Sequence, residues 1–105
     1  MTKYRIYYRK DPSFRVDKTL TKSKVNSSSF TTITTVDLAG KVSHALDRIF
    51  ASFQGETMTT LVLRKIRNKG GLHTSMSVGD CIENVETGAI YQCANTGWAR
   101  VPNKR

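Results

Sequence analysis

Residues 37–55, with the sequence DLAGKVSHALDRIFASFQG, carry the clearest secondary-structure pattern of the chain. Apolar side chains recur there at helical spacing, at Leu38, Val42, Ala45, Leu46, Ile49, Phe50 and Phe53. Asp37 is a natural N-cap, and Gly55 is a natural C-cap. The pattern therefore predicts a helix from Leu38 to Gln54, whose apolar stripe packs on a sheet.

Two segments before this helix have the composition of strands. Residues 3–9 alternate, so that Tyr4, Ile6 and Tyr8 fall on one face. Residues 30–36 are rich in Thr, Ile and Val, which favour strands. We expect Ile6 and Ile33 near the middle of one sheet. Residues 14–25 alternate only weakly.

The C-terminal third predicts a β-hairpin that turns at Thr87-Gly88, because glycine tolerates a positive φ. A two-residue loop places Val85 opposite Ile90 and puts the two cysteines on opposite sheet faces. A three-residue loop would instead place Cys81 opposite Cys93. The apolar pair favours the first register, which predicts two free, mostly buried thiols. A short strand from Trp98 to Val101 follows, and residues 58–67 begin with another.

These elements predict one α+β domain over residues 1–105, a small antiparallel sheet of four to six strands with one main amphipathic helix packed on it. Its parts are a basic N-terminal strand or arm (1–25), the helix (37–55), and a signature loop with the hairpin (73–101). No apolar run approaches the ~18 residues of a membrane span. The basic N-terminus has no apolar stretch behind it, so we expect a cytosolic protein.

The charge is strongly positive, +9 from 17 Lys and Arg against 8 Asp and Glu. The cations gather in residues 3–24, in residues 64–69 and at the C-terminus. A balance of this kind favours a polyanionic partner, usually nucleic acid, through phosphate contacts and counterion release. Plain solubility or an acidic protein surface would explain the same charge.

Enzyme chemistry finds little support in the sequence. It contains no phosphate-binding loop and no dinucleotide fingerprint, and its eight acidic residues are scattered. His73, Ser75, Ser77, Asp80 and Cys81 are neighbours in sequence, but catalytic groups are defined by geometry. The four His and Cys residues, His44, His73, Cys81 and Cys93, lack the close pairs typical of metal sites. We therefore expect no catalytic residue, no metal and no cofactor.

The most distinctive residues are HTSMSVGDCI at 73–82, GAIYQCA at 88–94 and Gly97-Trp98. They resemble the C-terminal signature of YodL-like small proteins, which bacteriophages, archaeal viruses, plasmids and integrated elements carry. The upstream order is also similar: a Thr-rich strand, Asp37-Leu38, and a helix that ends in Gln54-Gly55-Glu56. The resemblance covers about residues 30–101. It implies a mobile-element origin but no activity, so it transfers no catalytic residue. Cys81 stands where the family pattern has Val or Ile, which indicates a packing role.

The first functional hypothesis is a non-enzymatic accessory protein of a virus or mobile element that binds DNA or RNA. The predicted contacts are Lys3, Arg5, Arg9, Lys10, Arg64, Lys65, Arg67, Lys69, His73, Thr74 and Ser75. Exposed Tyr7, Tyr91 and Trp98 could stack on unpaired bases, although the composition favours a core position for Trp98.

The alternative is a protein-binding modulator, for example an inhibitor of a host defence or regulatory protein. It would bind its host or viral partner through the signature loop and the edge of the hairpin. A third hypothesis is a homo-oligomer that associates through an exposed edge strand. No feature predicts a membrane partner.

Overall fold

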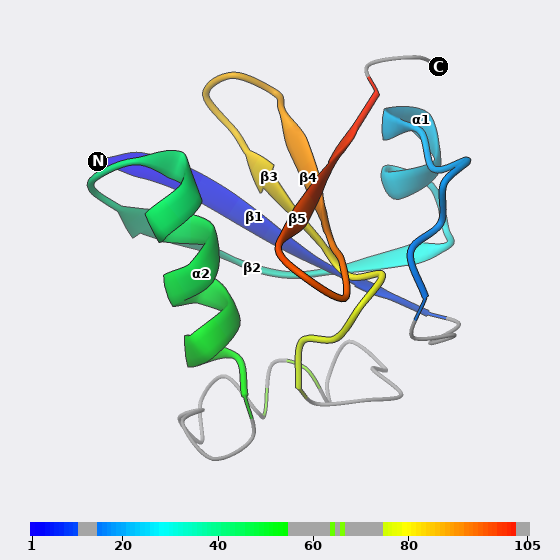
Figure 1. The fold of residues 1–105 in the computed structure, drawn as a ribbon, viewed down its shortest axis with the longest axis horizontal. Coiled ribbons are helices and arrows are strands. Elements are labelled where there is room, and N and C mark those ends of the chain that lie inside the picture. Colours follow the sequence, from blue (N-terminus) through cyan, green and yellow to red (C-terminus); the bar gives the residue numbers. More distant parts are fainter. Residues whose placement is uncertain (11–14, 55–63, 65, 67–74, 103–105) are drawn as a thin grey trace.

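The computed structural model describes residues 1–10, 15–54, 64, 66 and 75–102, and these form a five-stranded antiparallel sheet with two helices (Figure 1). The elements are β1 (Thr2–Arg9), α1 (Lys22–Val25), β2 (Phe30–Leu38), α2 (Val42–Ser52), β3 (Cys81–Asn84), β4 (Ile90–Cys93) and β5 (Trp98–Val101). The strand order is β2-β1-β3-β4-β5. The predicted α+β class is therefore confirmed.

The main helix covers one face of this sheet, as its apolar stripe predicts. Tyr4, Ile6 and Tyr8 of β1 are buried in one cluster with Ala45, Leu46 and Ile49 of α2, and with Ile66. The Tyr8 and Phe53 rings meet edge to face at 6.5 Å. Burial of each large side chain stabilises the fold by about 1.5–3 kcal/mol.

The opposite face carries a second core, which the sequence analysis did not anticipate. Strand residues Tyr7, Cys81 and Ile90 are buried there with Leu20 and Val25, which precede β2. Figure 1 shows α1 and α2 on opposite sides of the strands. The N-terminal segment is therefore integral to the fold: β1 lies between β2 and β3, and the weakly alternating residues include the one-turn helix α1.

The predicted start of the main helix was wrong. Asp37 and Leu38 belong to β2, where they pair with Lys3 and Thr2 of β1. The helix begins at Val42, and its N-cap residue makes no side-chain capping hydrogen bond. Leu38 fits the helical spacing, but pairing with β1 extends the strand through it. Gly40 then turns the chain with a φ of 95°. The predicted end was wrong as well: the helix ends at Ser52 with Phe53 as its C-cap, two residues before the predicted end at Gln54, and Gly55 lies outside the described residues.

The predicted hairpin register was also wrong, by two residues. Glu83 pairs with Ile90, and Cys81 pairs with Gln92. The side chain of Asn84 sets this longer turn, because its Oδ1 accepts the backbone N–H groups of Glu86 (3.1 Å) and Thr87 (3.3 Å). A shift of two residues preserves the face of each side chain. Both thiols are therefore free and buried, as predicted.

Three smaller expectations have mixed outcomes. The last strand runs from Trp98 to Val101 as predicted. Ile33 does not lie near the middle of the sheet, because β2 is an edge strand, although Ile33 is buried. The strand predicted at the start of residues 58–67 lies outside the described residues. Within the described part of the chain, no helix has the length and apolarity needed to cross a membrane.

Candidate nucleic-acid interface

The arginines of β1 point away from α2, and their contacts decide how far they can reach a ligand. Arg5 Nη1 lies 3.2 Å from Oε1 of Glu83 in an ion pair across to β3. The Tyr7 hydroxyl donates to the same oxygen at 3.0 Å, and burial is the main cause that raises the pKa of Tyr7. Arg5 therefore neutralises a buried carboxylate, which competes with the phosphate role predicted for it.

Arg9 is held even more firmly by the protein itself. Its side chain is only 12% exposed, and Nη1 donates to the backbone oxygen of Arg15 at 3.2 Å. Nη2 lies 3.8 Å from Oδ2 of Asp17, and the guanidinium carbon lies 5.7 Å from the centre of the Phe30 ring. Arg9 thus fastens residues 15–17 to the end of β1. We name this set of contacts the Arg9 clamp.

Gly79 is the residue that leaves room for the clamp. Its φ is 99°, and a Cβ atom there would lie 3.0 Å from the Arg15 oxygen and 3.1 Å from Arg9 Nη1. An L-residue pays for positive φ and would also push against backbone, so Gly79→Ala should lower the free energy of unfolding by about 2 kcal/mol.

Urea unfolding of the two alanine variants would measure this effect. Gly97→Ala is the matched control, because Gly97 also has a positive φ, of 72°, but a Cβ there would meet nothing within 4 Å. It should cost only about 1 kcal/mol. Equal losses in the two variants would contradict the close packing at Gly79.

Asp17 organises the segment that the clamp holds. Its Oδ1 accepts the backbone N–H (2.9 Å) and the hydroxyl (2.6 Å) of Thr19, and its Oδ2 lies 3.4 Å from Lys24 Nζ. These hydrogen bonds from Thr19, followed by the charge of Lys24, hold the pKa of Asp17 below its usual value. Its backbone N–H donates to Gln92 Oε1 at 2.7 Å, which ties the segment to β4. The only acid in residues 15–25 is therefore already satisfied.

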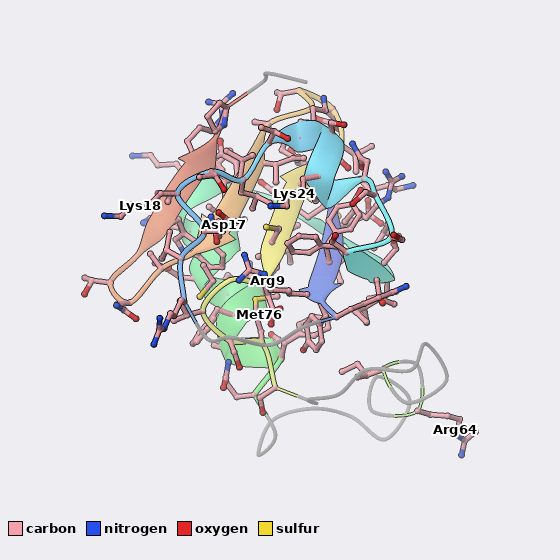
Figure 2. The ribbon with its side chains drawn as sticks, turned by 90° about the vertical axis from the view of Figure 1, so that its right-hand side faces the viewer. Arg9, Asp17, Lys18, Lys24, Arg64 and Met76 are labelled. Carbon is pink, nitrogen blue, oxygen red and sulfur yellow. The ribbon has the colours of Figure 1, made fainter. Side chains whose placement is uncertain are left out.

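Five cations lie close to the clamp in sequence, between residues 10 and 24, although the Nζ of Lys22 extends toward Gly88 at the turn between β3 and β4. They are Lys10, Arg15, Lys18, Lys22 and Lys24, all exposed except the half-buried Lys22, and we call them the basic surface. Figure 2 shows Lys18, Asp17, Arg9 and Lys24 together on this side. Only Lys10 was predicted as a contact residue. The density of cations between residues 9 and 24 was the signal that could have found the others.

The remaining predicted contacts do not join this surface. Lys3 is exposed and lies opposite Asp37 of β2. Arg64 is exposed, and Figure 2 shows it apart from Arg9 and Lys24. The other predicted contacts, Lys65, Arg67, Lys69, His73 and Thr74, lie outside the described residues. Of the second basic cluster the structure therefore describes one cation, Arg64, and this residue does not join the basic surface.

The described part of the signature loop has a structural role. Asp80 is only 1% exposed, and its carboxylate accepts the backbone N–H groups of Arg9 (2.9 Å) and Ser77 (2.8 Å). The N–H of Met76 donates to the Phe53 oxygen at 2.9 Å. Residues 75–80 thus lead from the end of α2 to the start of β3. The half-buried Ser75, a predicted contact, accepts the Ser77 hydroxyl at its backbone oxygen.

Neither cysteine offers an activated nucleophile. Burial raises the pKa of Cys81, and it raises that of Cys93 to about 11. Both sulfurs are therefore neutral thiols at pH 7, and the thiolate is the reactive form. Among the residues that the structure describes, no group of three or more His, Cys, Asp or Glu side chains is placed to hold a metal ion.

The aromatic side chains predicted to stack on bases have different environments. Tyr7 is buried, which removes it as a stacking surface. Tyr91 and Trp98 are half-buried and line an open groove of about 350 Å³ between α2 and β5, together with Val42, Ser43, Leu46 and Arg100. We call this the α2–β5 groove. Trp98 therefore packs against the core, as expected, and also borders the groove.

Comparison with protein-family models, with curated proteins and with solved structures found no match to this chain. The resemblance to YodL-like proteins therefore stays a prediction from the sequence.

Proposed function

We propose that this protein is a non-enzymatic, nucleic-acid-binding accessory protein of a virus or mobile element, acting in the cytosol of the host cell. The basic surface is the observation that carries the proposal. The mobile-element origin rests on the resemblance of residues 30–101 alone.

The anchoring of the basic surface favours a role in phosphate binding. The clamp and the Gln92 contacts fix the backbone from which Arg15 and Lys18 extend. Asp17 lies between them in sequence, but its oxygens are bound by Thr19, Arg9 and Lys24. Exposed cations on a fixed backbone lose less freedom on binding than cations on a mobile tail. Phosphate contacts from such groups give affinity without sequence preference.

The chemistry of the described residues supports a non-enzymatic role. The thiols are buried and protonated, and Asp80 is bound to two backbone N–H groups. Asp17 accepts the backbone N–H and the hydroxyl of Thr19. The two carboxylates are occupied by hydrogen bonds and the two thiols are protonated, so none of the four is activated as a base or nucleophile.

The alternative of a protein-binding modulator finds no support in the surfaces proposed for it. Both strands of the hairpin are interior, because β3 lies between β1 and β4, and β4 lies between β3 and β5. The sheet edges are instead β2 and β5. The described part of the signature loop, residues 75–80, is buried or half-buried.

The proposal is tested by fluorescence anisotropy of labelled single- and double-stranded DNA and RNA with the purified, nuclease-treated protein. Between about 50 and 200 mM salt, log K should fall linearly with log salt, with a slope of roughly −2 to −3.5 for three to five phosphate contacts on a single strand. Absence of binding near physiological salt would refute the proposal. Binding that salt does not weaken would indicate an apolar interface instead.

A further inference from the structure

The α2–β5 groove combines aromatic walls with a cation at its opening. Tyr91 and Trp98 form one side, and Val42 and Leu46 of α2 form the other. The Arg100 guanidinium carbon lies 5.6 Å from the centre of the Tyr91 ring, and Arg100 is exposed. The volume of about 350 Å³ falls within the range of small-molecule sites, ~300–1,000 Å³.

The indole of Trp98 is held in place before any ligand arrives. Its Nε1–H donates to Oδ1 of Asp47 at 3.1 Å. The Phe50 ring meets it edge to face, with centres 6.3 Å apart and an angle of 83° between the planes. Because these contacts fix the ring, a planar ligand that packs against it costs little ordering entropy. They also occupy the Asp47 carboxylate, which does not line the groove.

The position of the groove favours a ligand that carries phosphates. Tyr91 and its neighbour Gln92 face opposite sides of β4, and Gln92 binds the Asp17 backbone in the segment of the basic surface. Among the described strands, only the edge strand β5 lies beyond β4, and its Arg100 is exposed. The basic surface and the groove therefore lie on the two sides of one narrow ribbon. A flexible polyanion that crosses the edge of β5 can contact both.

We infer that the α2–β5 groove binds an unpaired base of a single-stranded nucleic acid, with Arg100 on the adjoining phosphate. This inference rests on the proposed function and narrows it, since bases inside a duplex are already stacked. Aromatic side chains accept any base on its flat face, so the groove adds affinity with little sequence preference.

The test uses Trp98 itself, because it is the only tryptophan of the chain. Emission of the unaltered protein is measured on addition of a single-stranded oligonucleotide, the matching duplex, and polyphosphate, which has no bases. The single strand should quench Trp98 emission strongly, the duplex weakly, and polyphosphate not at all. Quenching of equal size by all three probes would refute base stacking.

Variants of Trp98 provide the second readout, with a labelled oligonucleotide. Trp98→Leu should weaken single-strand binding roughly 10-fold and leave duplex binding unchanged, whereas Trp98→Phe should keep most of the affinity. Thermal unfolding shows whether each variant is folded. If single strands bind the protein but do not quench Trp98 emission, and if they bind Trp98→Leu as tightly as the unaltered protein, the groove inference is wrong and the proposed function stands.

Two further outcomes separate the inference from its alternatives. If no nucleic acid binds at all, the proposed function fails, and the inference fails with it. If a hydrophobic dye shifts Trp98 emission but oligonucleotides do not, the groove is a docking site for an apolar side chain of a protein, which also overturns the inference.

Discussion

Asp80→Ala is expected to lower the free energy of unfolding by about 3–4 kcal/mol. The change removes the acceptors of two backbone N–H groups, from Arg9 at the end of β1 and from Ser77 in the signature loop. Each loses a charge-assisted hydrogen bond at a position that water reaches poorly. Urea unfolding followed by circular dichroism would measure the loss.

Two other aspartate variants provide the controls. Asp80→Asn keeps one oxygen acceptor, so it should lose roughly half as much stability. Asp37→Ala removes an exposed carboxylate from edge strand β2 and should change stability by about 0.5 kcal/mol or less. If Asp80→Ala is no worse than Asp37→Ala, the structural role of the signature loop is refuted.

The second large effect concerns binding. Replacing Arg15 and Lys18 together by Glu should weaken nucleic-acid binding roughly 10- to 100-fold near 100 mM salt, because two phosphate contacts become repulsive. The salt slope for a single strand should become shallower by about 1.4. Both side chains are exposed and neither forms an ion pair among the described residues, so the fold should be unaffected. Anisotropy titrations at several salt concentrations give both quantities.

A second double charge reversal, placed elsewhere on the protein, shows whether binding depends on the basic surface or on the net charge. Replacing Lys41 and Arg48 by Glu also lowers the net charge by four, from +9 to +5, but on the exposed side of α2. We expect this variant to weaken binding no more than about 3-fold, through the general field of the protein. Equal losses in the two variants would mean that binding follows net charge, and the basic surface would lose its assigned role.

The sequence predicts those parts of the fold that depend on local patterns. The alternation around Ile6 and the helical spacing around Leu46 identify β1, α2 and the face of each that is buried. The start of α2 could not be predicted, because Leu38 fits both the helical spacing and a strand. Its pairing with Thr2 of β1, which is distant in sequence, makes it part of the strand. The hairpin register could not be predicted either, because the length of the loop depends on hydrogen bonds to the side chain of Asn84.

The candidate site follows the same division. Its charge is visible in composition, whereas its location depends on which residues fold back on the sheet. The sequence pattern predicts Arg9 as a phosphate contact. In the fold, however, its guanidinium group lies over the Phe30 ring and pairs with Asp17. Arg15 and Lys18 were counted only as charge, and the clamp makes them part of one surface. In the signature loop, Gly79 and Asp80 form a buried turn against Arg9, a structural role that the sequence pattern alone does not indicate.

The place of β1 in the sheet also governs how the chain reaches its fold during synthesis. β1 is synthesised before the other described strands, yet one of its two neighbours, β3, begins only at Cys81. Before β3 is made, the edge of β1 that it covers in the folded sheet lacks that partner, and an unpaired strand edge is prone to pairing with other chains. Contacts such as that of Arg5 with Glu83, 78 residues apart, form only after a long stretch of chain has closed on itself, which slows folding.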